Sequence, residues 1–391
     1  MKKIAIDTSA ISEKYGIRGA GFYAKRLIKA FQKINTGDCQ ISSFNFKEAS
    51  KEKLSSYSLL HYPYFDPFFP TLPFRKVKPT IVTVHDLIPL KFPQYFPRGI
   101  RGEIKWQMQK LSLKSSAGII TDSKSSKKDI YKITGYNKEK IHVVYLAPDE
   151  EFKVLKKEKL PPIAKKFKLP QNYILYVGDL NWNKNLPGLI NSFYGLKKTD
   201  YSLVIVGKAF LNKNLAERIT LVKLIKKLNI SSKVKFLGFI PTKDLTAVYN
   251  LAKVYCQPSF YEGFGLPVLE AMACGCPVVS SNASSLSEIA GEATLLVKPE
   301  VKEITKGLSK LIGSESLKNK LKEKGLRQAS KFTWEKTARQ TLKIYSSVIS
   351  SSLSLRAEAL SEKNNLGSIR HPEESESPRH PEESSTKDLL L

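Results

Sequence analysis

Residues 262–270 read Glu-Gly-Phe-Gly-Leu-Pro-Val-Leu-Glu, so seven residues that include a glycine-rich turn separate two carboxylates. The two glycines have no Cβ, so the backbone between the carboxylates can approach a ligand closely. Pro267 suits the first turn of a helix, because the N–H that it lacks has no helical partner there. The stretch therefore predicts a loop that carries Glu262 and a helix whose first turns carry Glu270.

A helix that begins here presents backbone N–H groups to an anion. The N–H groups of Gly265, Leu266 and Val268 point out of the first turn, where the helix dipole also favours negative charge. A phosphate there has a carboxylate on either side, and carboxylates accept hydrogen bonds from sugar and ribose hydroxyls. This is the chemistry of a nucleotide-sugar site. The simpler alternative is that Glu270 is a helix surface residue, and the spacing alone does not separate the two.

A second polar loop, Val177-Gly-Asp-Leu-Asn-Trp-Asn-Lys-Asn-Leu186, follows a predicted strand. Ligands of α/β sheets bind outside the carboxyl ends of the strands, so Lys184 is placed to meet a phosphate. The alternative is a solvated loop lysine, one of 64 basic residues in the chain.

Two segments nearer the N-terminus fit the same picture. Tyr15-Gly-Ile-Arg-Gly-Ala-Gly-Phe-Tyr23 follows the first predicted strand, although it lacks the G-x-G-x-x-G order of a dinucleotide site and the lysine of a P-loop. His85 and Asp86 follow an apolar strand. A lone histidine there is more often structural, but the neighbouring Asp86 could orient it for catalysis.

Strand-like and helix-like segments alternate along the 391 residues, which predicts an α/β protein with parallel sheets and two domains. The Lys- and Pro-rich stretch 152–170 is typical of an interdomain linker. We predict two Rossmann-like domains, 1–165 and 166–333. A helix over 334–352 follows, and then a tail over 353–391. The tail repeats Arg-His-Pro-Glu-Glu-Ser, which cannot bury a core, so it is predicted to be disordered.

The chain has a net charge of +28, which indicates an anionic partner: nucleic acid, a membrane surface or a phosphorylated substrate. The predicted helix over 100–113 and its ends combine basic and large apolar residues, namely Arg98, Arg101, Lys105, Lys110 and Lys114 with Ile104, Trp106, Met108 and Leu111. A helix of this kind can lie on an anionic bilayer. The alternative, slightly preferred here, is a solvated helix whose apolar residues face the first-domain core.

Other partners find less support in the sequence. There is no helix-turn-helix, RNP-type or zinc pattern, so no specific nucleic-acid partner is expected. The cysteines, Cys39, Cys256, Cys274 and Cys276, lack metal-site spacing and are expected to be buried and reduced. No run approaches the roughly 18 apolar residues of a membrane span, and the start is too short in apolar residues for a signal peptide. We expect a cytoplasmic protein, with or without peripheral attachment to the inner face of the plasma membrane.

Taken together, these segments resemble the retaining glycosyltransferases of family 4, which have the two-domain GT-B fold. The most specific match is the two-glutamate segment with its continuation, Ala273-Cys-Gly-Cys-Pro-Val-Val-Ser-Ser281 and Asn282 to Gly291. The remaining matches are Tyr176–Gly178 with Lys184–Leu186, Phe236–Gly238, Phe332–Trp334, the glycine-rich loop, His85-Asp86 and Thr121–Ser123. The resemblance covers residues 1–350 and is closest to mannosyltransferase-like members, which implies a role in cell-envelope polysaccharide biosynthesis.

The resemblance implies a hexosyltransferase with two facing domains, 1–165 on the acceptor side and 166–333 on the donor side, and a C-terminal helix that returns to the first. Its donor is a nucleoside diphosphate sugar, with GDP-mannose favoured, and its acceptor is a glycan or a lipid-linked sugar. Family members need no metal or other cofactor, because cationic side chains and helix N-termini replace it.

The resemblance also assigns roles to residues. His85 touches the donor sugar near the reacting carbon, Lys184 neutralises the departing diphosphate, and Glu262 contacts the sugar hydroxyls. Donor binding is assigned to Gly19, Gly21, Gly178, Lys184, Gly263, Phe264, Gly265, Leu266 and Glu270, the last of which holds the ribose. Tyr23, His61 and Asp86 are candidates for the acceptor side, and the aromatic stretch 61–70 is expected to be a loop that faces the cleft.

One departure from the family pattern bears on activity. Many relatives have an arginine just after the loop glycine or just before the lysine, where this chain has Asp179 and Asn183. A lost diphosphate contact weakens stabilisation of the leaving group. A protein that binds a sugar nucleotide without transferring it is therefore one alternative, and a basic nucleic-acid-binding protein is another.

Overall fold

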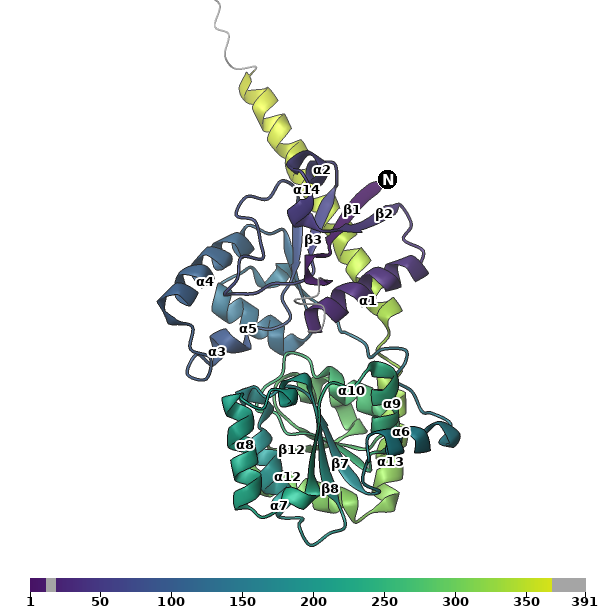
Figure 1. Ribbon diagram of the computed structural model, residues 1–391. Helices are drawn as coiled ribbons and strands as arrows, with labels where there is room; N and C mark the ends of the chain where they lie inside the picture. Colours follow the sequence, from purple (N-terminus) through teal and green to yellow (C-terminus); the bar gives the residue numbers. More distant parts are fainter. Residues whose placement is uncertain (12–18, 368–391) are drawn as a thin grey trace, which may run out of the picture. The chain divides into compact units, whose positions relative to one another are not determined.

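The computed structural model describes residues 1–11 and 19–367 (Figure 1). Residues 1–348 form one compact unit, and residues from 349 onward form a second, of which the end of helix α14 is described. Residues 12–18, which include the first part of the predicted glycine-rich loop, and the part of the predicted tail from 368 lie outside the described residues. Within the described part, no helix has the length and apolar character needed to cross a membrane.

The first half of the chain builds a six-stranded parallel sheet in the order β2-β1-β3-β4-β5-β6. The strands β3, β4 and β5 are buried at every position, as expected for a parallel sheet with helices on both faces. The strands are β1 (Lys2–Asp7), β2 (Cys39–Phe44), β3 (Leu59–Tyr62), β4 (Thr80–Thr83), β5 (Gly118–Thr121) and β6 (Ile141–Val143). The helices are α1 (Gly19–Lys33), α2 (Lys51–Ser55), α3 (Ile88–Lys91), α4 (Gly99–Lys114) and α5 (Lys124–Thr134).

The second half repeats this plan with the strand order β12-β11-β10-β7-β8-β9, again parallel throughout. The strands are β7 (Tyr173–Val177), β8 (Ser202–Val206), β9 (Val234–Leu237), β10 (Val254–Gln257), β11 (Val278–Ser281) and β12 (Leu295–Val297). The helices are α6 (Pro161–Lys166), α7 (Leu186–Tyr194), α8 (Ala216–Lys227), α9 (Thr242–Leu251), α10 (Leu266–Ala273), α11 (Ser285–Ala290), α12 (Val301–Ile312) and α13 (Glu315–Ala329). The two sheets confirm the predicted pair of Rossmann-like α/β domains.

Helix α14 (Trp334–Gly367) begins after the second sheet and packs on the first. Thr337 Oγ1 donates to the carbonyl of Tyr145 at 2.7 Å, and Tyr345 OH lies 2.5 Å from His61 Nδ1. The helix thus returns to the first domain, as predicted. It runs to Gly367 rather than ending at 352, because the next residues include the strong helix formers Ala, Leu, Glu and Lys.

Some elements of the first half differ from the sequence expectation. The strand β3 includes His61 and Tyr62, which were expected to lie in a loop that faces the cleft. The segments β2 and α5 were not predicted as elements, because both are rich in serine. For α5, a hydrogen bond from the Ser126 N–H to Ser123 Oγ caps the N-terminus and compensates for the polar sequence.

Candidate functional site

Lys184 and Glu262 meet where the second sheet reverses its strand order. β7 and β10 are neighbours, and the strands that follow them lie on opposite sides. Such a switch point is where open α/β sheets bind ligands, outside the carboxyl ends of the strands. The loop after β7 carries Lys184, and the loop after β10 carries Glu262. The ammonium Nζ of Lys184 lies 2.9 Å from Oε1 and 2.7 Å from Oε2 of Glu262.

The Glu262 carboxylate is held from other directions as well. Gln257 Nε2 donates to its Oε1 at 2.9 Å, and Ser259 Oγ donates to the same oxygen at 2.7 Å. The backbone N–H of Glu262 donates to Ser284 Oγ at 2.8 Å. Because the side chain is buried and multiply bonded, its orientation is fixed, and it anchors the Lys184 ammonium.

His85 and Asp122 form a second pair, at the carboxyl ends of β4 and β5. His85 Nδ1 lies 2.7 Å from Asp122 Oδ2. Burial lowers the pKa of His85, but Asp122, with smaller contributions from Asp86 and the Pro63 backbone, raises it, and the net shift is upward. The ring lies near the Pro63 backbone, yet Nε2 makes no well-formed hydrogen bond among the described residues. The imidazole is therefore oriented by Asp122, and its Nε2 is a buried atom.

Asp86 lies between the two pairs and close to Gly263. A Cβ built on Gly263 would be 2.8 Å from both Cβ and Oδ2 of Asp86, so only glycine fits there without displacement. Burial raises the pKa of Asp86, and the charges of His85 and Lys184 act in the opposite direction. Since Asp86 also interacts with Glu262, the structure brings the three predicted catalytic residues, His85, Lys184 and Glu262, to one charged cluster.

Hydrogen bonds join the loops of the two sheets around this cluster. Ser123 Oγ donates to the Gly263 carbonyl at 2.7 Å. The carboxylate of Glu288 accepts a hydrogen bond from the Lys124 backbone N–H at 2.7 Å, at the first residue of α5. The α5 N-terminus in the first half is thus capped by a side chain of the second half.

The predicted donor loop enters α10 through Gly265, which has a φ of 103°. This left-handed conformation favours glycine, and a Cβ there would lie 2.5 Å from Leu286 Cδ2. Leu266 is the first residue of α10, and the Phe264 ring packs at 6.2 Å from the Tyr145 ring. Phe264 therefore offers a ligand its backbone rather than its side chain.

Glu270 lies one turn further along α10. Tyr249 OH donates to its Oε2 at 3.0 Å. Burial raises the pKa of Glu270 to about 7, although the Tyr249 hydrogen bond and the charge of Arg26 lower it. The carboxylate therefore changes charge near neutral pH, unlike an ordinary surface glutamate.

The remaining predicted donor residues lie at element ends. Gly19 and Gly21 begin α1, and the space around a Cβ on Gly19 is open to 4 Å. Gly178 directly follows β7, and its N–H donates to the Val206 carbonyl at 3.0 Å.

Two family models match consecutive parts of the chain. Glycosyltransferase Family 4 matches residues 40–152, and Glycosyl transferases group 1 matches residues 161–328. The O-antigen chain mannosyltransferase B of Escherichia coli is 31% identical over 312 residues, which are 75% of this chain and 79% of that protein. This chain belongs to glycosyltransferase family 4.

Another relative of this glycosyltransferase is also named a mannosyltransferase, and two solved structures are similar to it in fold. The serotype-specific mannosyltransferase WbdA of E. coli is 31% identical over 281 residues, which are 70% of this chain but 34% of that longer protein. Among solved structures, the sucrose-phosphate synthase of Thermosynechococcus elongatus has a TM-score of 0.70 at 19% identity and covers 90% of this chain and 100% of that one. Anabaena HepE in complex with UDP and glucose has a TM-score of 0.68 at 18% identity and covers 89% of this chain and 100% of that one. At these identities the structures show the shared GT-B fold.

Two predicted acceptor residues of the glycosyltransferase lie in its core. His61 is fully buried, and its Nε2 lies 2.8 Å from Thr83 Oγ1. Burial lowers the pKa of His61 to about 3, so it is neutral. Tyr23 is also buried, and its OH lies 3.2 Å from the same Thr83 oxygen. Neither side chain reaches a surface where an acceptor could bind, because β3 and α1 turn them inward.

The aspartate that orients His85 was misassigned from the sequence. Asp86 is adjacent in the chain, but its Oδ1 accepts from the Ile88 N–H at 3.0 Å and caps α3. Asp122, from a neighbouring strand, bonds to the imidazole instead. Gln257, Ser259 and Ser284 were likewise missed, because no motif marks them and only the fold brings them to Glu262.

The two departures from the arginine pattern have different structural roles. Asn183 is buried, and its Nδ2 donates to the Tyr261 carbonyl at 2.9 Å, so it fixes the loop that carries Glu262. Asp179 is exposed, and its Oδ1 accepts from the Leu180 N–H at 3.0 Å. Neither supplies a positive charge, which leaves Lys184 as the cation bonded to Glu262.

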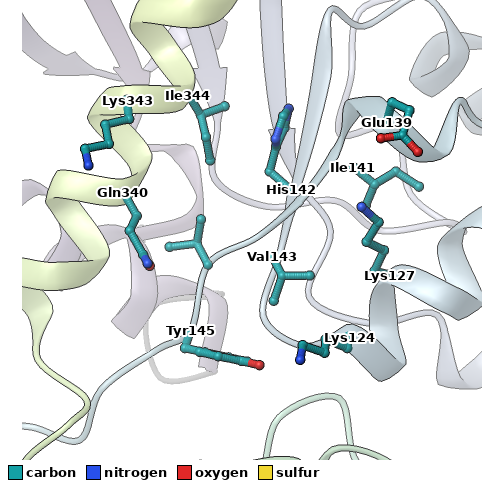
Figure 2. A pocket seen from close by; sticks show the side chains of 11 residues that line it. Lys124, Lys127, Glu139, Ile141, His142, Val143, Tyr145, Gln340, Lys343 and Ile344 are labelled. Carbon is teal, nitrogen blue, oxygen red and sulfur yellow. The ribbon is translucent and has the colours of Figure 1, made fainter.

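A large pocket of about 710 Å³ lies beside β6. Figure 2 shows Lys124 and Lys127 of α5 and Lys343 of α14 among its lining residues. No predicted site residue lines it. Among residues 1–11 and 19–367, no three His, Cys, Asp or Glu side chains are grouped closely enough to hold a metal ion.

Proposed function

We propose that this glycosyltransferase moves a hexose, with mannose favoured, from a nucleoside diphosphate sugar to a glycan or lipid-linked acceptor with retention of configuration. The observation that carries the proposal is the charged cluster of Lys184, Glu262, His85 and Asp122 at the carboxyl ends of the two parallel sheets. A fixed ammonium beside an oriented imidazole suits a reaction in which negative charge develops on a departing phosphate.

The choice of donor rests on the site and on the relatives. Glu270 keeps Oε1 for the ribose hydroxyls while Tyr249 occupies Oε2. HepE has been crystallised with UDP and glucose, which supports a nucleotide sugar in general. The E. coli relatives are named mannosyltransferases, which favours GDP-mannose as the donor. Because the first is an O-antigen chain enzyme, we place the reaction in cell-envelope polysaccharide synthesis, in the cytoplasm or on the inner face of the plasma membrane.

Retention by front-side attack is supported by the state of Glu262. A double displacement needs a free carboxylate nucleophile. Here Oε1 accepts three hydrogen bonds and Oε2 accepts one, all at 2.9 Å or less. In the proposed step, the bond between the anomeric carbon and the diphosphate oxygen breaks, and the acceptor oxygen bonds to the same face of that carbon. The acceptor proton passes to the departing phosphate oxygen.

We propose that no metal takes part in this step. Lys184 supplies positive charge at the diphosphate, and the backbone N–H groups at the start of α10 supply dipoles. The His85 imidazolium, stabilised by Asp122, faces the donor sugar.

The first test is donor binding measured by thermal shift with GDP-mannose, UDP-glucose and UDP-N-acetylglucosamine. A ligand that binds only the native state raises its stability, so one donor is expected to raise the melting temperature. Lys184→Ala is expected to abolish that shift and transfer, since it removes the ammonium at the diphosphate. Lys213→Ala, in an exposed loop of the same half, is the matched control and is expected to behave like the wild type.

Two results would contradict the proposal. A full shift and full transfer in Lys184→Ala would remove this cluster from the site. A donor shift without transfer to any glycan or lipid-linked acceptor would instead favour a sugar-nucleotide-binding protein, for which Asp179 and Asn183 are the motivating residues. The stereochemistry is read from the anomeric coupling constants of the product by NMR, and an inverted product would exclude front-side attack.

A further inference from the structure

Tyr261 precedes Glu262 in the loop after β10, and its hydroxyl group reaches the first half of the chain. There it meets the side chains of Lys91, at the end of α3, and of Ser125 and Asp129, in α5. The helices α3 and α5 are in contact with each other in the first half (Figure 1). We call Lys91, Ser125 and Asp129 the tyrosine socket.

The Tyr261 hydroxyl uses every hydrogen-bonding position that a hydroxyl group has. It donates its proton to Asp129 Oδ2 at 2.5 Å and accepts from Lys91 Nζ at 2.9 Å. Ser125 Oγ lies 2.9 Å from the same oxygen. Because the one proton of the Tyr261 hydroxyl goes to Asp129, Ser125 is the donor in this bond. The tyrosine socket therefore matches a hydroxyl group and nothing less polar.

The tyrosine socket is charged and is formed within the first half. Lys91 Nζ bonds to Asp129 Oδ1 at 2.6 Å, and the Asp129 side chain is buried. Burial lowers the pKa of Lys91, but its hydrogen bonds to Asp129 and Tyr261 raise it, with a net increase. Hydrogen bonds that involve an ionised group are stronger than those between neutral groups. Two of the three bonds of the Tyr261 hydroxyl are of the stronger kind.

The backbone of Tyr261 is fixed in the second half. Its carbonyl accepts from Asn183 Nδ2 at 2.9 Å, and Asn183 directly precedes Lys184. The N–H of Phe260 donates to the Asn183 carbonyl at 2.8 Å. The backbone of Tyr261 thus joins the loop of Lys184 to the loop of Glu262, while its hydroxyl group is held by the first half.

We propose that Tyr261 is a positioning residue of the transfer reaction, an inference that rests on the function proposed above. Docking of its hydroxyl in the tyrosine socket holds the Lys184–Glu262 pair of the second half against the half that carries His85. The bonds that orient Glu262 within the second half do not involve this hydroxyl. Loss of the hydroxyl is therefore expected to slow the chemical step while the second half still binds the donor.

The test is Tyr261→Phe, assayed with GDP-mannose as donor and a mannose oligosaccharide as acceptor. Its kcat is expected to fall at least about tenfold, which corresponds to one hydrogen bond to a charged group. Its KM for GDP-mannose is expected to stay within about twofold of the wild-type value, and the thermal shift with GDP-mannose is expected to be kept.

The matched control is Tyr194→Phe, in the second half. Tyr194 OH accepts from Lys197 Nζ at 2.8 Å, and that ammonium lies 4.1 Å from the ring centre. Lys91 Nζ lies 4.3 Å from the centre of the Tyr261 ring, so the two tyrosines have similar lysine partners. Because Lys197 belongs to the same half as Tyr194, this control is expected to keep the wild-type kcat.

Ser125→Ala tests the tyrosine socket from the first half. It is expected to lower kcat less than Tyr261→Phe does, because it removes a bond between two neutral hydroxyl groups. Combined with Tyr261→Phe, it is expected to have no further effect, since both substitutions remove the same bond. Effects on kcat that simply add would overturn the proposal.

Two other kinetic results would also overturn it. One is wild-type kcat in Tyr261→Phe, and the other is a raised KM with loss of the thermal shift, which would assign Tyr261 to donor binding. If the wild type itself transferred nothing, the proposed function would fail, and small-angle scattering with GDP-mannose would test the docking. A larger radius of gyration for Tyr261→Phe than for the wild type is then expected, and equal radii would exclude docking.

Discussion

Asp122 is the group that most raises the pKa of His85. Burial lowers the pKa of the imidazole and the carboxylate raises it, with a net increase. A histidine with a raised folded-state pKa adds stability below its unfolded pKa, and loses that contribution as the pH rises through the folded value. The His85 imidazole therefore keeps its positive charge to a higher pH than a free histidine would.

Asp122→Asn is therefore expected to move the alkaline limb of the pH–rate profile to lower pH, because the imidazolium loses its counter-charge. Histidine NMR titration should show the same change for His85 and none for His142, which makes no contact with Asp122. A wild-type pH profile in the variant would show that His85 is not the titrating group.

Glu270 also has a raised pKa, but here burial itself is the cause, since it raises the pKa from 4.5 to about 7. The native state binds a proton more tightly than the unfolded chain, so stability falls as the pH rises between these values. Above pH 7 the ionised carboxylate costs roughly 3 kcal/mol as an upper figure, at about 1.4 kcal/mol per unit. Glu270→Gln is expected to raise the melting temperature at pH 8 and to abolish donor binding.

The control for Glu270→Gln is Glu292→Gln, whose carboxylate is on the surface and paired with Lys324. It is expected to leave the slope of melting temperature against pH unchanged. If Glu270→Gln showed that same slope, Glu270 would have an ordinary pKa and would be ionised throughout this range.

At the scale of single residues, the sequence showed which charged residues belong to the candidate site but not which side chains they contact. Lys184 and Glu262 could be predicted because each stands in a polar loop after an apolar strand. Asp122 could not be assigned to His85, because the pair depends on β4 and β5 being neighbours in the sheet. His61 and Tyr23 were misplaced for the same reason, since polar side chains buried within a hydrogen-bonded core resemble site residues in a sequence.

At the scale of elements, the loop between β10 and α10 must approach the first half closely. Gly263→Ala would place a Cβ 2.8 Å from Asp86, and that overlap must be relieved by moving one of the loops. An overpacked contact costs about 1–3 kcal/mol of stability in the arrangement that holds the two loops together. A cost of this size in the free energy of the transition state lowers kcat/KM about tenfold or more, which is the expected result. Gly313→Ala is the control, because its Cβ would meet only Ser309 O, at 3.3 Å. Unchanged kcat/KM in Gly263→Ala would mean that this approach is not needed in catalysis.

The spacing of apolar residues predicted the extents of most helices but not which face of each helix packs on the core. For α4 the helical span was correct, and the preferred interpretation turned its apolar residues toward the core. Trp106 does face the core, whereas Ile104, Met108 and Leu111 do not. A helix with apolar residues on two opposite faces satisfies the same pattern in either orientation, so only packing decides which face is covered.

For the whole molecule, hydrogen bonds and ring contacts between loops of the two halves hold unit 1–348 together around its site. Tyr95 stacks on Trp182 with ring centres 3.6 Å apart and an interplanar angle of 10°. Lys91 Nζ donates to Tyr261 OH at 2.9 Å. The sequence predicted two domains because each has its own periodic strands and helices. It could not predict these contacts, which join single residues of unrelated loops.

Glu288 makes the most easily tested of these contacts. Its carboxylate accepts from the Lys124 N–H at 2.7 Å and from the Ser125 N–H at 3.4 Å, at the positive end of α5. Loss of a cap costs about 0.5–2 kcal/mol, and here the cost falls on the contact between the halves rather than on either half alone. Glu288→Ala is therefore expected to shift the molecule toward separated halves, which small-angle scattering should record as a larger radius of gyration.

The second expected effect of Glu288→Ala is more hydrolysis of the donor by water. Closure of an active site excludes water from the reacting sugar. In Glu288→Ala, the ratio of free sugar released to sugar transferred is expected to rise, because water reaches the donor more often. Glu292→Gln, four residues further along and outside the contact, is expected to leave that ratio and the radius unchanged. A larger radius with an unchanged ratio would show that the Glu288 contact holds the halves together without shielding the donor.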